Sequence, residues 1–81
     1  MIVNLLLSKC EYTSSLIKES IENNRDDETV IAYSANVLRY IRKYIDYYEG
    51  PKEDLEELSV QYHKVFNEYI EFQLKRMERV F

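Results

Sequence analysis

The sequence predicts an all-α fold, a three-helix antiparallel bundle that forms a single domain over residues 1–81. A chain of 81 residues is long enough for one domain and too short for two. It contains one glycine and one proline, whereas strand-rich folds need a reverse turn about every 8 to 12 residues. Turn-forming residues gather at only two places, 23–27 and 49–52. They separate three segments for which we predict helices, near 2–23, 27–49 and 51–80.

The first segment is predicted to be a helix because its apolar residues recur at helical spacing. Thr13, Ser14 and Ser15 weaken the prediction, since short hydroxyl side chains compete for backbone hydrogen bonds in mid-helix. An alternative makes residues 2–7 a short strand and begins a helix near Thr13, which gives an α+β fold. The low turn content favours the long helix, whose apolar face carries Val3, Leu6, Cys10, Ile17 and Ile21.

The alternative with an N-terminal strand is accompanied by a resemblance to a known protein family. Residues 13–18 (TSSLIK) and 36–45 (NVLRYIRKYI) resemble segments of elongin C and the related BTB/POZ-type ubiquitin-ligase adaptors. The resemblance covers less than half of the chain, and it implies that Tyr44 occupies an aromatic partner-binding position. The family's first strand has no equivalent here, and Glu68 and Glu71 fall where its later helix is apolar. We therefore base the fold prediction on the helical pattern.

The second segment has a helical row of apolar residues behind an acidic N-terminus. Asp26 or Asp27 is suited to cap the first turn, because a short carboxylate accepts hydrogen bonds from free backbone N–H groups. Residues 34–49 are predicted to be helical, whereas residues 28–33 also suit a short strand. The row consists of Val30, Ser34, Val37, Ile41, Tyr44 and Tyr48, with Leu38 and Ile45 beside it.

The third segment has the clearest pattern, because two apolar rows run along it side by side. Together they predict a wide face that packs against two neighbouring helices. Gly50 is suited to close the preceding helix in the left-handed conformation, and Pro51 to begin the next one. The first row is Leu55, Leu58, Tyr62, Val65, Tyr69 and Phe72, and the second is Phe66, Ile70, Leu74, Met77 and Phe81.

Helix lengths and tyrosine content predict that the bundle is completed by a protein partner, most simply as a homodimer. At 1.5 Å per residue, the second helix is about 35 Å long and the third about 45 Å, so about two apolar turns project. Tyr40 and Tyr47 lie on the flank of the second helix, beyond its core row. Tyrosine is common in interfaces because its ring is apolar and its tip polar. The predicted partner-binding residues are Tyr40, Tyr44, Tyr47, Met77, Val80 and Phe81, with core burial the competing prediction for Tyr44.

The residue types that carry enzyme or metal chemistry are scarce. Cys10 is the single cysteine and His63 the single histidine, so one chain offers no disulfide and no Cys/His zinc cluster. There is no glycine-rich phosphate loop. The apolar run at residues 5–7 is too short to cross a membrane or to form a secretory signal. We expect a cytoplasmic protein without catalytic residues, metal or cofactor.

Net charge argues against a nucleic-acid or membrane binder. The chain carries a net charge of −4 and has a pI of about 5.0, which disfavours contact with phosphates. We predict a non-enzymatic protein–protein interaction module that acts as a regulator or adaptor. One alternative is an acidic inhibitor, of a kind found in viruses and mobile elements, that uses residues 26–28 and 53–57 to block a nucleic-acid-binding protein. The other is nucleic-acid binding through Arg39, Arg42 and Lys43.

Overall fold

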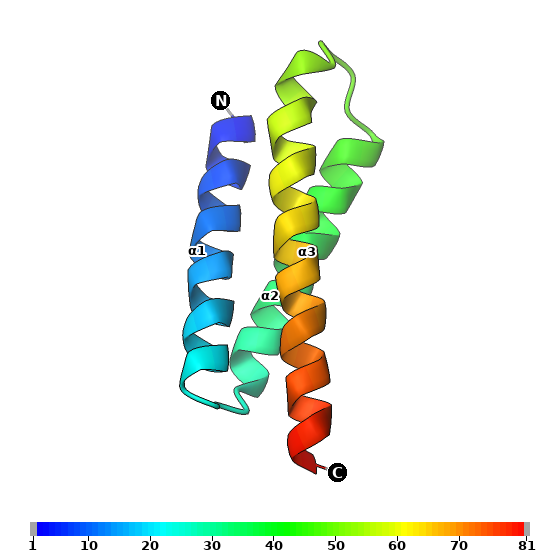
Figure 1. Cartoon of the computed structure of the whole chain (residues 1–81). Helices are drawn as coiled ribbons and strands as arrows, with labels where there is room; N and C mark the ends of the chain where they lie inside the picture. Colours follow the sequence, from blue (N-terminus) through cyan, green and yellow to red (C-terminus); the bar gives the residue numbers. More distant parts are fainter. Residues whose placement is uncertain (1, 81) are drawn as a thin grey trace.

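The protein is a three-helix bundle. The computed structural model describes residues 2–80, with side chains up to residue 78. Helices α1 (Ile2–Glu22), α2 (Glu28–Asp46) and α3 (Glu53–Val80) all pack against one another, with no strand in the described range. In Figure 1, α1 and α3 lie side by side, and α2 runs obliquely behind them. The predicted all-α bundle is confirmed, and the alternative with an N-terminal strand is wrong.

Helix α1 continues through its three hydroxyl residues because each hydroxyl finds an acceptor. The Thr13 hydroxyl donates to the backbone carbonyl of Lys9 at 2.7 Å, and the Ser15 hydroxyl to that of Glu11 at 3.1 Å. The Ser14 hydroxyl donates instead to the carboxylate of Glu68 on α3. The hydroxyls therefore bond along the helix or across the bundle, and they do not compete with the helix for its own N–H groups.

The end of α1 is closed by Asn24, which has a φ of 53°. The N–H of Arg25 donates to the carbonyl of Ser20 at 2.9 Å, and the N–H of Asn24 to that of Ile21 at 3.2 Å. This pair of bonds is the Schellman arrangement, which needs a left-handed residue just after the helix. The prediction that Gly50 adopts the left-handed conformation is wrong, because Gly50 does not have a positive φ.

Substitutions of Asn24 will show how much this left-handed turn contributes. We expect Asn24→Ala to lower the free energy of unfolding by about 1 kcal/mol, because an alanine side chain is strained at positive φ. Asn24→Gly should leave stability equal or slightly higher, since glycine adopts this conformation without strain. Urea denaturation followed by circular dichroism measures both. Equal losses in the two variants would mean that the asparagine side chain, and not the backbone conformation, stabilises the turn.

The two ends of α2 are held by neighbouring acidic and aromatic side chains. Asp27 is the N-cap, and its carboxylate accepts from the N–H groups of Thr29 and Val30 at 3.1 and 3.3 Å. The helix ends at Asp46, three residues before the predicted end. After the helix, the side chain of Tyr48 lies near the start of α3, where its hydroxyl donates to the carboxylate of Asp54 at 3.1 Å.

Gly50 lies close against the side chain of Tyr48 in the α2–α3 connection. A Cβ atom at this position would lie 2.6 Å from the hydroxyl oxygen of Tyr48 and 2.7 Å from the ring carbon that bears it. Any side chain at residue 50 must therefore displace the Tyr48 ring and its hydrogen bond to Asp54. The sequence correctly predicted that the connection between the second and third helices includes Gly50. The reason is the close approach of the Tyr48 ring to the Gly50 backbone, and not the φ angle of Gly50.

The core runs along the three-helix seam and combines large apolar with small polar side chains. Ser34 is fully buried on α2, and its hydroxyl oxygen has no hydrogen-bond partner within the described chain. Thr13, Ser14 and Ser20 are buried on α1, and their small size permits close packing of the helices. The largest fully buried side chains are Phe72, Leu6, Ile17, Ile41, Leu58 and Val65.

Ser34→Ala is expected to stabilise the protein. A buried hydroxyl without a partner loses the hydrogen bonds that water gives it in the unfolded chain, and alanine also has the higher helix propensity. We expect the free energy of unfolding to rise by about 1 kcal/mol. Chemical denaturation of the two proteins measures the change, and a loss of stability would show that the hydroxyl has a partner in solution.

Candidate protein-binding surfaces

The first candidate surface is an exposed row of apolar side chains along the C-terminal half of α3, here called the α3 row. It consists of Phe66, Ile70, Leu74 and Met77, which are 40%, 41%, 54% and 54% exposed. The spacing matches the second of the two predicted rows. Met77 was predicted to lie on the projecting end of the helix, whereas Phe66, Ile70 and Leu74 were predicted to pack against a neighbouring helix and are open instead. The first row, which includes Leu58, Val65 and Phe72, is buried in the core.

Helix α3 is longer than α2, and the two helices cross obliquely. Arg76 pairs with Asp26 just before α2, so only the part of α3 beyond Arg76 projects past the other helices. Helix α3 has 28 residues and α2 has 19, which corresponds to about 42 and 28 Å. Figure 1 shows the C-terminal end of α3 extending past the connection between α1 and α2. The prediction of one unbroken, overlong third helix is confirmed.

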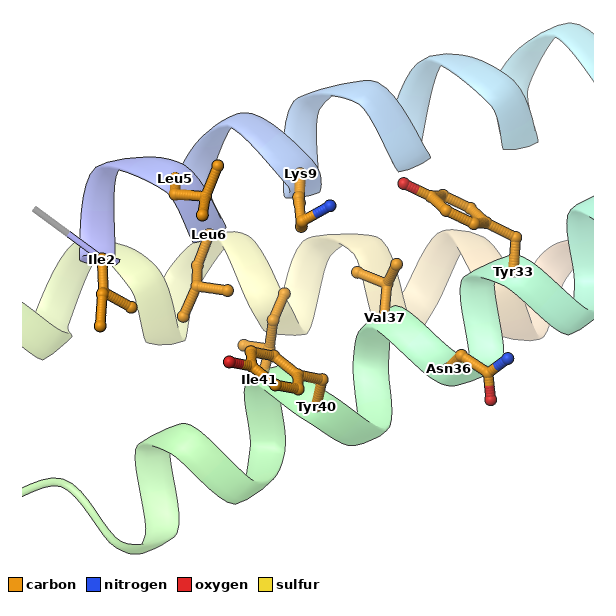
Figure 2. Close-up of a pocket in the computed structure, with 9 residues that line it drawn as sticks. All are labelled: Ile2, Leu5, Leu6, Lys9, Tyr33, Asn36, Val37, Tyr40 and Ile41. Carbon is orange, nitrogen blue, oxygen red and sulfur yellow. The ribbon is translucent and has the colours of Figure 1, made fainter.

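The second candidate surface is a groove between α1 and α2, here called the α1–α2 groove. It has a volume of about 470 Å³, and Figure 2 shows it opening where the two helices diverge, with α3 behind. Near one end, the rings of Tyr12 and Tyr33 meet edge to face, 5.9 Å apart between centroids. The lining residues are Ile2, Leu5, Leu6 and Lys9 from α1 and Tyr33, Asn36, Val37, Tyr40 and Ile41 from α2.

Charge on the α1–α2 groove is positive. Lys9 is the one charged residue among the nine that line it, and Figure 2 shows its amine reaching into the space between the helices. Among the described side chains, Lys9 makes no ion pair. The groove of an overall acidic protein therefore contains one unpaired basic side chain.

Charges of both signs lie beside the α3 row. Glu71 follows Ile70 directly, Lys75 follows Leu74, and Glu78 follows Met77. All three residues are exposed, and none of them makes an ion pair with any side chain that the structure describes. The α3 row is thus an apolar surface flanked by both acidic and basic side chains.

The predicted partner-binding residues fall into three groups. Tyr40 lines the α1–α2 groove and Met77 belongs to the α3 row. Tyr47 is 82% exposed at the end of α2, outside the groove lining. Tyr44 is half-buried against the core and contacts the ring of Tyr48, 5.5 Å away between centroids. The prediction for the side chain of Val80 and for Phe81 lies outside what the structure describes.

Sequence reasoning missed the α1 wall of the groove. Ile2 and Leu5 are 58% and 57% exposed, and each is an ordinary apolar residue of a helix. Their place beside Tyr40 depends on the angle at which α2 crosses α1, which the periodicity of either helix does not contain. One signal in the sequence was available. Tyr40 lies on the flank of the core row of α2, and this is the side of α2 on which the groove opens.

Several reactive or charged side chains are buried in the core or paired with another side chain of the bundle. Burial raises the pKa of the Cys10 thiol, so the thiol stays neutral in the core. Asp26 forms an ion pair with Arg76 on α3. Arg42 pairs with Asp46 at 3.2 Å, so one of the three predicted phosphate-contacting residues is partly neutralised. Within residues 2–80, no group of three acidic, histidine or cysteine side chains is placed to hold a metal ion.

The burial of Cys10 predicts slow reaction with thiol reagents. We expect the native protein to react with a disulfide reagent such as DTNB at least an order of magnitude more slowly than the protein unfolded in urea, because the thiolate must form in an apolar site. The absorbance of the released thiol gives both rates. Similar rates would show that α1 detaches easily from the bundle.

Comparison with known proteins gives no match, so a functional proposal has to rest on the surfaces described above. Protein-family models, curated proteins and solved structures were searched, and none matches the chain. Over residues 2–80, none of the helices combines the length and the apolar character needed to cross a bilayer.

Proposed function

We propose that the protein is a non-enzymatic protein–protein interaction module of the cytoplasm that self-associates as a homodimer and acts as a regulator or adaptor. The observation that carries the proposal is the α3 row, because four large apolar side chains at consecutive helical positions stay open to solvent. Apolar patches of this kind, bordered by charged residues, are typical of protein interaction sites.

The energetics require both copies to contribute apolar surface to the contact. Burying the exposed half of four such side chains contributes roughly 3–6 kcal/mol, so burying the rows of both copies contributes roughly 6–12 kcal/mol. A dimer with micromolar affinity needs about 8 kcal/mol beyond the entropy lost on association. A stable homodimer therefore has to bury apolar surface on each of its two copies.

The test compares two charged substitutions on the same helix. Leu74→Glu places a carboxylate in the centre of the α3 row, whereas Val60→Glu places one at a residue that is 65% exposed and lies outside the row. Size-exclusion chromatography with light scattering, at tens of micromolar protein, should give a dimer for the wild type and Val60→Glu. Leu74→Glu should be monomeric with unchanged circular dichroism. A monomeric wild type would reject the proposal.

A further inference from the structure

We propose that the homodimer forms by antiparallel packing of the α3 rows of two copies. The inference rests on the proposed self-association and identifies its contact surface, the orientation of the two helices and their register. A contact between two identical surfaces across a two-fold axis must be complementary to itself. The α3 row meets this condition both in its apolar side chains and in the charges along one edge.

The apolar pattern of the row is nearly unchanged when the helix is reversed. Antiparallel pairing that places Ile70 opposite Leu74 of the partner subunit has its centre at position 72. In the same register, Phe66 lies within one residue, about 1.5 Å along the axis, of Met77 of the partner subunit. All four exposed side chains of each copy therefore enter one contact, and each copy buries apolar surface as a stable dimer requires.

Charged side chains with alternating signs follow one edge of the row. They are separated by seven, four and three residues, so they lie on the same side of α3. All four are exposed, and none makes an ion pair with a side chain that the structure describes. They are Lys64, Glu71, Lys75 and Glu78.

Reversing the helix brings opposite charges on this edge together. With the centre at position 72, Glu71 lies two residues, about 3 Å along the axis, from the partner's Lys75. Glu78 has the same offset from the partner's Lys64, and the two-fold axis repeats both pairs. Glu71 also lies at this offset from Glu71 of the partner subunit. Four attractive contacts thus oppose one repulsive contact, which favours this orientation and register.

A parallel pair of α3 rows lacks this match. In that orientation, the charged edge of each copy faces the other edge of the partner's row. The described residues on that other edge offer no free charge, because Gln73 is uncharged and Arg76 already pairs with Asp26 of its own chain. The charges therefore select the antiparallel pair.

The first experiment reverses charges at the centre of the contact. Glu71→Lys and Lys75→Glu each convert the central attractive pairs into like-charge pairs, so each variant alone should dimerise at least about tenfold more weakly than the wild type. Glu57→Lys is the control, because residue 57 is exposed on the same helix and lies beyond the contact; it should dimerise like the wild type. Light scattering over a dilution series measures the affinities, and circular dichroism should show native helicity throughout.

A mixture of Glu71→Lys and Lys75→Glu tests whether the two edges meet. One chain then has only basic and the other only acidic side chains at positions 71 and 75, so every central contact is attractive. We expect a heterodimer at least as tight as the wild-type dimer, detected by native mass spectrometry with one variant isotopically labelled. If the mixture shows no preference for the heterodimer, or if the single reversals dimerise like the wild type, the inference fails while the proposed function stands. If the wild type itself is monomeric, both fail.

Disulfide formation tests the orientation independently. Ile70→Cys and Leu74→Cys place thiols at residues that face each other across the contact, so an oxidised mixture of the two variants should contain a covalent heterodimer. Each variant alone should not cross-link, because the antiparallel register separates its two thiols by four residues, about 6 Å along the axis, in addition to the distance between the helices. Cys10 is buried, and the wild type serves as the control. Cross-links in each variant alone would indicate a parallel pair and overturn the inference.

Discussion

Replacing Phe72 with alanine is expected to remove most of the stability of the protein. Phe72 is the largest fully buried side chain and lies on α3 at the centre of the three-helix core. Its loss leaves a cavity that close-packed helices fill only in part, at a cost of about 3–5 kcal/mol. Folded domains are stable by only about 5–15 kcal/mol, and small ones lie near the lower limit. Urea denaturation followed by far-ultraviolet circular dichroism measures the loss.

The matched control for Phe72→Ala is Phe66→Ala. It is the same substitution on the same helix, at a side chain that is 40% exposed. We expect a loss of at most about 1 kcal/mol in the monomer, because water already contacts much of this ring. Both variants should be measured at low protein concentration, so that self-association does not enter. Equal losses would contradict the assignment of Phe72 to the core and of Phe66 to an open surface.

Glu68→Ala is expected to have the second largest effect. The two carboxylate oxygens of Glu68 accept from the Ser14 hydroxyl at 2.9 and 2.8 Å, and Lys18 lies 3.9 Å away. Ser14 is buried, so removing the carboxylate leaves its hydroxyl without an acceptor in an apolar seam. Hydrogen bonds to charged groups contribute about 1.5–3 kcal/mol, and we expect a loss of that size.

A double-mutant cycle isolates the contact between Ser14 and Glu68. If the hydrogen bond causes the effect, Ser14→Ala and Glu68→Ala together should destabilise the protein by about 1 kcal/mol less than the sum of the single changes. Glu57→Ala, on the exposed side of α3, serves as the control and should change stability by less than about 0.5 kcal/mol. Strict additivity in the cycle would show that the two side chains do not interact in solution.

The helices were predictable because their signals are local. The start of α2 follows from the capping chemistry of Asp27, and the length of α3 from an uninterrupted apolar pattern after Pro51. The difficult stretch, Thr13 to Ser15, was ambiguous because the acceptor of its middle hydroxyl lies outside the helix. That acceptor, Glu68, is 54 residues away from Ser14 in the chain. Contacts of that kind are not visible in the propensity of single residues.

The candidate surfaces were predictable only in part. An apolar residue on a helix is either core or surface, and the choice depends on the crossing angle of its neighbours. Phe66, Ile70 and Leu74 of the second row of α3 were expected to pack against a neighbouring helix, and they are open instead. Tyr40 was placed correctly on an open flank. Tyr44, four residues later, is half-buried against the core, as the competing prediction for this residue stated.

The long-range polar contacts of α3 bear on how the chain is made. Ser14 bonds to Glu68, and Asp26 to Arg76, across separations of 54 and 50 residues. The acceptor for Ser14 therefore does not exist until most of the polypeptide has left the ribosome. A nascent chain that ends before α3 has two amphipathic helices without a cover, a state that chaperones bind and that aggregates readily. Synthesis of α3 should thus convert the whole molecule to its folded form in one late, cooperative event.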